Sequence, residues 1–203
     1  MKQTPILVDD NVVATSLTEA ELATLRVEIT RLQRENRALS IALAEMERVA
    51  QRDMLTPLFN RRYFLSALHQ RLANADRDGG RTALIYVDVD GLKRINDAHG
   101  HGAGDLALIE VAARLMESAR RGDVVARIGG DEYGMLIDNI GAGEARALIR
   151  HMRAAIVSEP LELDEGNVQL SAAFGLTMLE AGRTAEDVIG SADADMYRSK
   201  RDH

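Results

Sequence analysis

Apolar residues recur at alternating steps of three and four between Leu17 and Arg52, and this heptad repeat constrains the fold more than any other feature. No glycine or proline interrupts the stretch, so we expect one helix of about 54 Å that begins at Ser16 or Thr18. A strict period of 3.5 residues over four heptads is typical of a coiled-coil seam rather than of a core helix. With Leu22 as position a, the inner rows are Leu22, Ile29, Asn36, Leu43 and Ala50, and Leu25, Leu32, Leu39 and Met46.

The composition of these inner rows predicts how many helices associate and in which direction. Leucine at most d positions and a buried Asn36 favour two parallel helices, because facing asparagines satisfy each other only in register. We therefore expect residues 17–52 to form the parallel coiled coil of a homodimer, preceded by a flexible tail at residues 1–16. A single helix docked on its own domain is the alternative.

After Arg52 the pattern changes to alternating strands and helices, which predicts a second domain over residues 53–203. Two short strands flank a Gly-Gly-Asp-Glu sequence that is typical of a hairpin. The expected fold class is α/β (or α+β), with a mixed central β-sheet flanked by helices. We expect helices at 60–75, 105–121, 143–158 and 184–200, and strands at 82–90, 124–128, 133–137 and 168–178.

The composition narrows the classes of function. The 203 residues carry 25 basic and 32 acidic side chains, and this net charge of −7 argues against a general nucleic-acid binder or a basic membrane-surface protein. The absence of cysteine excludes disulfide scaffolds, thiolate-bound zinc and thiol nucleophiles. No apolar run is long enough for a signal peptide or a spanning helix, so we expect a cytoplasmic protein with no membrane insertion. From the net charge we expect no nucleic-acid partner.

Two pairs of acidic residues lie where strands are expected to end or begin. Asp88 and Asp90 close an apolar strand, and their alternation predicts that they point to opposite faces, so that only one can join a given site. Asp131 and Glu132 follow Gly129-Gly130, where glycine permits positive φ and the close approach of an anionic ligand. If the two strands are neighbours, Asp88 and one hairpin acid can hold Mg²⁺ together with substrate phosphates.

Polar residues suited to a nucleotide lie just beyond the first pair of acids. Lys93 is a candidate phosphate partner, and Asn96 with Asp105 can read the donor edge of guanine. Two carboxylates, a metal and a lysine suit phosphoryl or nucleotidyl transfer, in which positioning and charge neutralisation provide most of the catalysis. From these residues alone, solvated acids in turns are an equally good explanation.

Four sequence blocks follow one another along the second domain: DMLTPLFNRR at 53–62, DVDGLKRINDAHGHGAGD at 88–105, GGDEY at 129–133 and ADMYRSK at 194–200. Together they resemble the GGDEF domain of diguanylate cyclases, which join two GTP molecules into cyclic di-GMP. Any one block is weak evidence, but four in the family's order over residues 53–200 are specific.

The resemblance implies a role for each matching residue. Asp88 and Asp131, with the carbonyl of Val89, would hold Mg²⁺ or Mn²⁺. Glu132 would help to activate the attacking ribose 3′-hydroxyl. The alternative is that it contacts only the ligands of the metal and transfers no proton. Catalysis would thus rest on Asp131, Glu132 and Asp88, and the GTP-binding set would be Gly91, Leu92, Lys93, Asn96, Asp105, Gly129, Gly130 and Lys200.

In the family, two such domains face each other, and each holds one GTP. A monomer would hold half of the reaction, so the expected homodimer raises the effective concentration of the second active site.

A further block, Arg120-Arg121-Gly122-Asp123, resembles the family's RxxD site, where cyclic di-GMP binds and inhibits. Arg120 would hold phosphate or guanine, and Asp123 a guanine edge. A charged helix C-terminus is the alternative. A second arginine usually completes the site, and because His151 falls near its position, Arg150 and Arg153 are the candidates.

Three positions depart from the family's pattern. Tyr133 replaces a phenylalanine, which a core tolerates if the hydroxyl finds a partner. Pro57 replaces a glycine and would stiffen the turn. The family's further phosphate-binding arginine, four residues after the lysine matched by Lys200, has no counterpart, so Arg198 or Arg201 replaces it or phosphate binding is weaker.

The sequence therefore predicts a dimeric diguanylate cyclase with product inhibition. A catalytically silent module that binds GTP or cyclic di-GMP is the alternative, and the intact Gly129–Glu132 sequence disfavours it. A coiled-coil adaptor, whose α/β domain is only a docking surface, leaves the group of site residues unexplained.

Overall fold

The computed structural model describes residues 18–75, 81–164 and 166–201. The chain divides into an N-terminal unit, residues 1–47, and a second unit, residues 48–203. The tail expected at residues 1–16 lies outside the described residues.

Helix α1 (Glu19–Ala50) confirms the long N-terminal helix. It begins with a reciprocal cap, in which the backbone N–H of Thr18 donates to Glu21 and the backbone N–H of Glu21 donates to the Thr18 hydroxyl. The apolar side chains of the predicted inner rows are exposed in this single chain, from 41% at Leu22 to 71% at Met46. Within the described residues, the helix therefore presents an exposed apolar seam.

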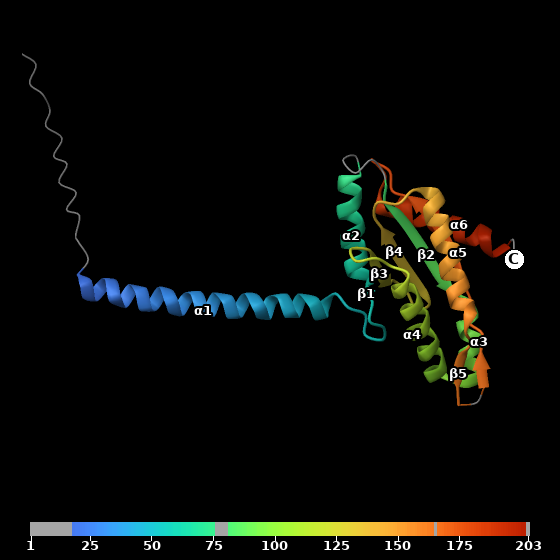
Figure 1. The fold of residues 1–203 in the computed structure, drawn as a ribbon, viewed down its shortest axis with the longest axis horizontal. Coiled ribbons are helices and arrows are strands. Elements are labelled where there is room, and N and C mark those ends of the chain that lie inside the picture. Colours follow the sequence, from blue (N-terminus) through green and yellow to red (C-terminus); the bar gives the residue numbers. More distant parts are fainter. Residues whose placement is uncertain (1–17, 76–80, 165, 202–203) are drawn as a thin grey trace, which may run out of the picture. The chain divides into compact units, whose positions relative to one another are not determined.

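A five-stranded mixed sheet organises the second unit, as predicted (Figure 1). The strand order is β1-β3-β4-β2-β7, in which β1 and β3 are parallel and all other neighbours are antiparallel. The strands are β1 (Phe59–Asn60), β2 (Ala83–Val89), β3 (Val124–Arg127), β4 (Glu132–Ile137) and β7 (Ala172–Met178).

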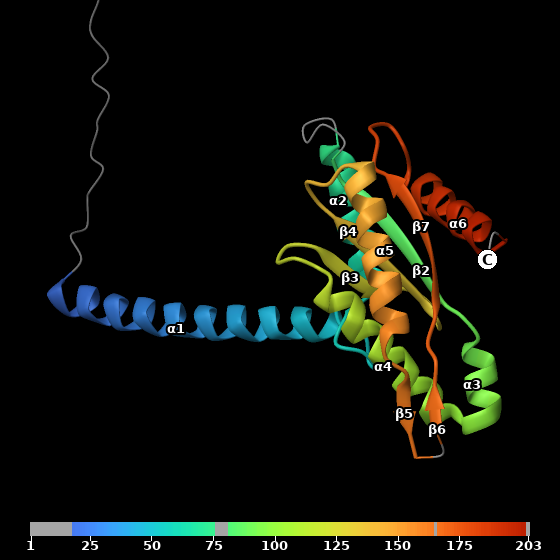
Figure 2. The same cartoon turned by 45° about the vertical axis from the view of Figure 1, so that its right-hand side comes forward.

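Helices cover both faces of this sheet (Figure 2). The strand period of two distributes the β2 side chains between two cores: Ile85 and Val87 pack with α4 and α5, whereas Leu84 and Tyr86 pack with α2 and α6. The four helices are α2 (Arg61–Asn74), α4 (His101–Glu117), α5 (Ala142–Ser158) and α6 (Ala185–Arg201).

Three short features were not predicted from the sequence. Helix α3 (Leu92–His99) follows β2 directly and is mostly polar, with only Ile95 buried, so it has a weak sequence signal. Strand β1 has two residues. A small hairpin of β5 (Leu161–Leu163) and β6 (Gly166–Val168) precedes β7, whereas the sequence predicted no strand before residue 168 in this region.

Tyr133 shows how the core accommodates the departure from phenylalanine. Its ring is fully buried, and its hydroxyl donates to the carbonyl of Leu108 in α4 at 2.8 Å. We expect Tyr133→Phe to lower the free energy of unfolding by about 1 kcal/mol, because one buried hydrogen bond is lost without a change of shape. Urea denaturation measures the difference, and an unchanged midpoint would show that the hydroxyl does not stabilise the fold.

Candidate active site

The site begins where β2 and β4 lie side by side. Asp88, near the end of β2, is directly opposite Glu132, the first residue of β4. The backbone N–H of Val89 donates to the carbonyl of Asp131 at 3.0 Å, which ties the hairpin tip to the strand end. The condition stated from the sequence, that these strands are neighbours, is therefore met, and the acids from two distant parts of the sequence lie at one edge.

Lys200 reaches the same acids from helix α6. Its ammonium nitrogen lies 2.5 Å from an Asp88 oxygen and 3.5 Å from an Asp90 oxygen. Burial acts to lower the pKa of Lys200, but the carboxylates of Asp88 and Asp90 outweigh it and raise that pKa, so the side chain stays protonated. One correction follows: Asp88 and Asp90 do share a site, because the ammonium of Lys200 contacts both carboxylates.

Of the two reasons predicted for the hairpin glycines, positive φ is wrong and the close approach of a ligand is retained at Gly130. Neither Gly129 nor Gly130 has positive φ. A Cβ on Gly129 would lie 2.1 Å from a carboxylate oxygen of Glu132, whereas nothing lies within 4 Å of one on Gly130. Gly129 therefore makes room for the Glu132 side chain, while the backbone of Gly130 stays open to a ligand.

Two residues support the acids and had no distinctive sequence signal. Burial, and then a hydrogen bond with Glu132, raise the pKa of the Tyr86 phenol, so Tyr86 donates its proton to the Glu132 carboxylate in that bond. Arg127 holds the hairpin tip, since its guanidinium donates to the carbonyl of Gly130 at 2.7 Å. Arg127 also lies 3.4 Å from Asp53, in the first of the four sequence blocks. That block therefore braces the hairpin.

The predicted guanine-reading residues lie on two helices that pack together, Asn96 on α3 and Asp105 on α4. The Asn96 side-chain oxygen is buried and has no hydrogen-bond partner within the described part of the chain. A Cβ on Gly104 would lie 1.9 Å from that oxygen, so the glycine before Asp105 leaves space for Asn96. Asp105 itself is exposed. A buried acceptor without a donor, beside an accessible carboxylate, is suited to a ligand's N–H edge.

The loop between β2 and α3 provides backbone rather than side chains. Gly91 precedes the helix with φ of 69°, a left-handed conformation that favours glycine. Leu92 packs partly against the core, and Lys93 is exposed. Lys93 belongs to α3 and Lys200 to α6, so the two lysines come from different helices.

The residues at the strand ends fit a hard divalent cation. Among residues 18–75, 81–164 and 166–201, no three His, Asp or Glu side chains cluster so that they could hold a metal by themselves. Mg²⁺ commonly uses only one or two carboxylates, however, and completes its shell with water and phosphates. The contact between the Lys200 ammonium and Asp88 shows that this carboxylate accepts a cation.

Arg120 and Asp123 line a separate pocket of about 390 Å³ at the end of α4. The Asp123 carboxylate accepts the backbone N–H of Arg120 at 2.8 Å, which closes the turn. From α5, His151 lines this pocket, whereas Arg150 and Arg153 line another one between α5 and α6. The structure therefore does not bring the two candidate arginines to Arg120 and Asp123.

Arg198 also lies away from the acids. It pairs with Asp195 at 3.2 Å and lines the pocket between α5 and α6. Residues 198 and 200 are two positions apart on one helix and so project in nearly opposite directions. The structure therefore does not support Arg198 as the missing phosphate-binding arginine, and the side chain of Arg201 lies outside the described residues.

The family model described as "Diguanylate cyclase, GGDEF domain" matches residues 50–203. The chain belongs to the GGDEF family. Two relatives from Pseudomonas aeruginosa are the bifunctional diguanylate cyclase/cyclic di-GMP phosphodiesterase MucR, 37% identical over 84% of this chain, and the diguanylate cyclase DgcP, 33% identical over 89%. The chain spans 26% and 27% of the lengths of these relatives.

Solved structures of the family agree with the fold. The coiled coil and GGDEF domain of DgcB from Caulobacter crescentus, in complex with c-di-GMP, matches with a TM-score of 0.78 and 27% identity over 88% of this chain and 95% of that one. The diguanylate cyclase SiaD from Pseudomonas aeruginosa, in complex with its activator SiaC, matches with a TM-score of 0.75 and 29% identity. This match covers 90% of this chain and 69% of that one. In the described part of this GGDEF protein, no helix has the length and apolar character to cross a membrane.

Proposed function

We propose that this chain is a diguanylate cyclase that condenses two GTP molecules into cyclic di-GMP and releases two pyrophosphates. The observation that carries this proposal is the convergence of Asp88, the Asp131–Glu132 pair and Lys200 at one sheet edge. Family membership supports it, because the named relatives include diguanylate cyclases.

Each residue has a task in binding. Asn96 would accept a hydrogen bond from the guanine edge with its unpartnered oxygen, and Asp105 would accept a second one. Lys93 and Lys200 would pair with the β- and γ-phosphates, while the backbone at Gly91-Leu92 and at Gly129-Gly130 allows the phosphates to approach. These contacts hold GTP so that its α-phosphate stays accessible.

Asp88 and Asp131, with the carbonyl of Val89, would hold Mg²⁺ or Mn²⁺. When bound, the metal neutralises charge on the phosphate oxygens. Lys200 would then move from Asp88 to the phosphates, since its ammonium and the metal are alternatives at that carboxylate. Glu132 would take up the proton of the 3′-hydroxyl, and its hydrogen bond with Tyr86 would orient the carboxylate.

The reaction needs two such domains, and the exposed seam of α1 supports a homodimer. Leu22, Leu25 and Leu32 are 41–50% exposed in the single chain, so pairing of two helices would bury them. Product inhibition is proposed at the pocket of Arg120 and Asp123, with His151 in the position of the second arginine.

The test is incubation of the purified protein with GTP and Mg²⁺, followed by chromatographic separation of the nucleotides. We expect cyclic di-GMP and pyrophosphate in a 1:2 ratio, and no product after removal of the metal with EDTA. Activity per protein molecule should fall on dilution because the dimer dissociates. Binding of cyclic di-GMP without any product at high protein concentration would contradict the cyclase and favour a catalytically silent binding module.

A further inference from the structure

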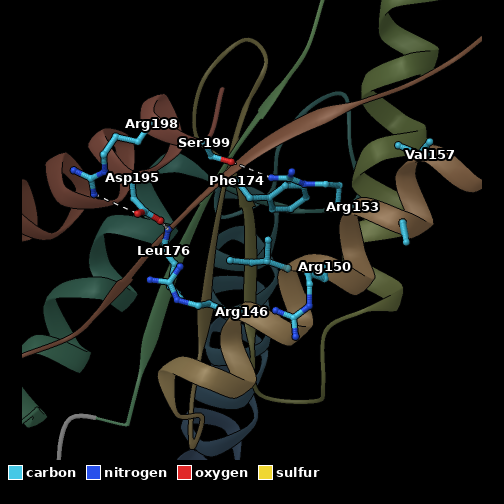
Figure 3. A pocket seen from close by; sticks show the side chains of 11 residues that line it. Arg146, Arg150, Arg153, Val157, Phe174, Leu176, Asp195, Arg198 and Ser199 are labelled. Carbon is cyan, nitrogen blue, oxygen red and sulfur yellow. Dashed lines mark hydrogen bonds and ion pairs between the residues drawn. The ribbon is translucent and has the colours of Figure 1, made fainter. Parts of the chain in front are cut away.

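A second large pocket, of about 750 Å³, lies between helices α5 and α6 beside strand β7 (Figure 3). Because β7 is the last strand in the described sheet order, only one of its edges pairs with another strand of that sheet. None of the acids at the ends of β2 and β4 lines this pocket, and neither Arg120 nor Asp123 does. It is therefore separate from the proposed active site and from the proposed inhibitory site.

Positive charge dominates the lining. Among the described residues that line the pocket, the one acidic residue is Asp195, and it is already engaged: it accepts the backbone N–H of Leu176 at 3.0 Å and pairs with Arg198 at 3.2 Å. Such a local excess of positive charge, in a chain of net charge −7, favours an anionic ligand. The arginines share one face of α5 through steps of four and three, and α6 adds another: Arg146, Arg150, Arg153 and Arg198.

The remaining wall is apolar and contains an aromatic ring. The guanidinium of Arg153 lies 5.9 Å from the ring centroid of Phe174 and donates to the hydroxyl of Ser199 at 3.2 Å, as Figure 3 shows. Ile149 and Val157 add aliphatic surface, and Val157 is 44% exposed. A flat guanidinium held in this way can stack on a planar ring, and the aliphatic groups can cover the ring's edge.

We propose that this pocket binds a nucleotide, with its phosphates on Arg146 and Arg150 and its base against Arg153 and Val157. Guanidinium groups match phosphate oxygens in pairs, which explains two exposed arginines one turn apart at the open side. A cavity of this volume accommodates a ligand of nucleotide size. An acidic protein segment would use the same charges, but an extended chain would not need the flat guanidinium of Arg153 beside the aliphatic surface of Ile149 and Val157.

Calorimetric titration of the full chain with nucleotides tests this proposal. The buffer contains EDTA, which removes divalent metal ions and so prevents metal-dependent nucleotide binding at the proposed active site. The probes are ADP, GDP and CDP, with inorganic pyrophosphate and adenosine as the separated halves. We expect at least one nucleotide to bind at least tenfold more tightly than either half. The amide resonances of Leu176 and Ser199 should shift on binding, since both line the pocket.

Arg146→Gln combined with Arg150→Gln should weaken nucleotide binding at least tenfold, and because both side chains are exposed the fold should be retained. The matched control is Arg62→Gln, which removes an exposed arginine beside β1, at the opposite edge of the sheet, and should leave affinity within about twofold. Three results would overturn the proposal: no nucleotide binding below about 1 mM, equal binding to the double variant, or equal affinity for pyrophosphate alone. Binding of acidic peptides but not of nucleotides would show a protein-docking surface in its place.

Discussion

Gly104→Ala is expected to impair GTP use without unfolding the protein. The added Cβ would lie 1.9 Å from the Asn96 oxygen, so the Asn96 side chain must swing out of its buried position. The guanine edge then loses an acceptor, and one unmade hydrogen bond of about 2 kcal/mol corresponds to a roughly thirtyfold fall in kcat/KM. Discrimination of GTP from ATP should fall as well, because the lost contact is the one that reads the base.

The matched control is Gly102→Ala, two residues earlier in α4. Nothing lies within 4 Å of a Cβ at that position, so activity should be unchanged. Both substitutions replace a helical glycine by alanine, which by itself stabilises a helix by up to about 1 kcal/mol. Steady-state kinetics with GTP and ATP, alongside thermal unfolding, separate the two effects. Equal kcat/KM values for the two variants would show that Asn96 does not read guanine.

Gly175→Ala is expected to destabilise the fold more than any other glycine substitution in the sheet. Its Cβ would lie 1.9 Å from the carbonyl oxygen of Ala192 and 2.7 Å from the backbone nitrogen of Met196. These atoms belong to the backbone of α6, so no side-chain rotation relieves the overlap and the helix must move off β7. We expect a loss of about 3 kcal/mol, or about 10 °C in the unfolding midpoint.

Gly190→Ala provides the control within α6 itself. This glycine has no neighbour within 4 Å of an added Cβ, so alanine should stabilise the helix by up to about 1 kcal/mol. Differential scanning calorimetry of both variants therefore should show shifts of opposite sign. A midpoint for Gly175→Ala within 2 °C of the parent would mean that α6 lies further from β7 than the structure shows.

The sequence predicted the elements whose residues have a strong period or a characteristic turn. The heptads predicted α1, and the apolar run before Asp88 predicted β2. Both predictions were possible because residues that become buried recur at the period of the helix or form the apolar run of the strand. Helix α3 was missed, since a short polar helix that buries one residue leaves little periodic signal. The four sequence blocks identified the family and named the candidate site residues.

Contacts between distant residues needed the tertiary structure. The separation of Arg150 and Arg153 from Arg120 and Asp123 depends on which face of α5 each residue occupies relative to α4 and α6. Lys200, near the end of α6, contacts both Asp88 and Asp90, although the alternation of these two residues along the chain predicted that only one could join a site. Sequence alone determined the family, the helix α1 and the residue types of the site. Only the tertiary structure decided which side chains meet, because a one-residue difference in where a strand ends or in helical phase redirects a side chain by 100° or more.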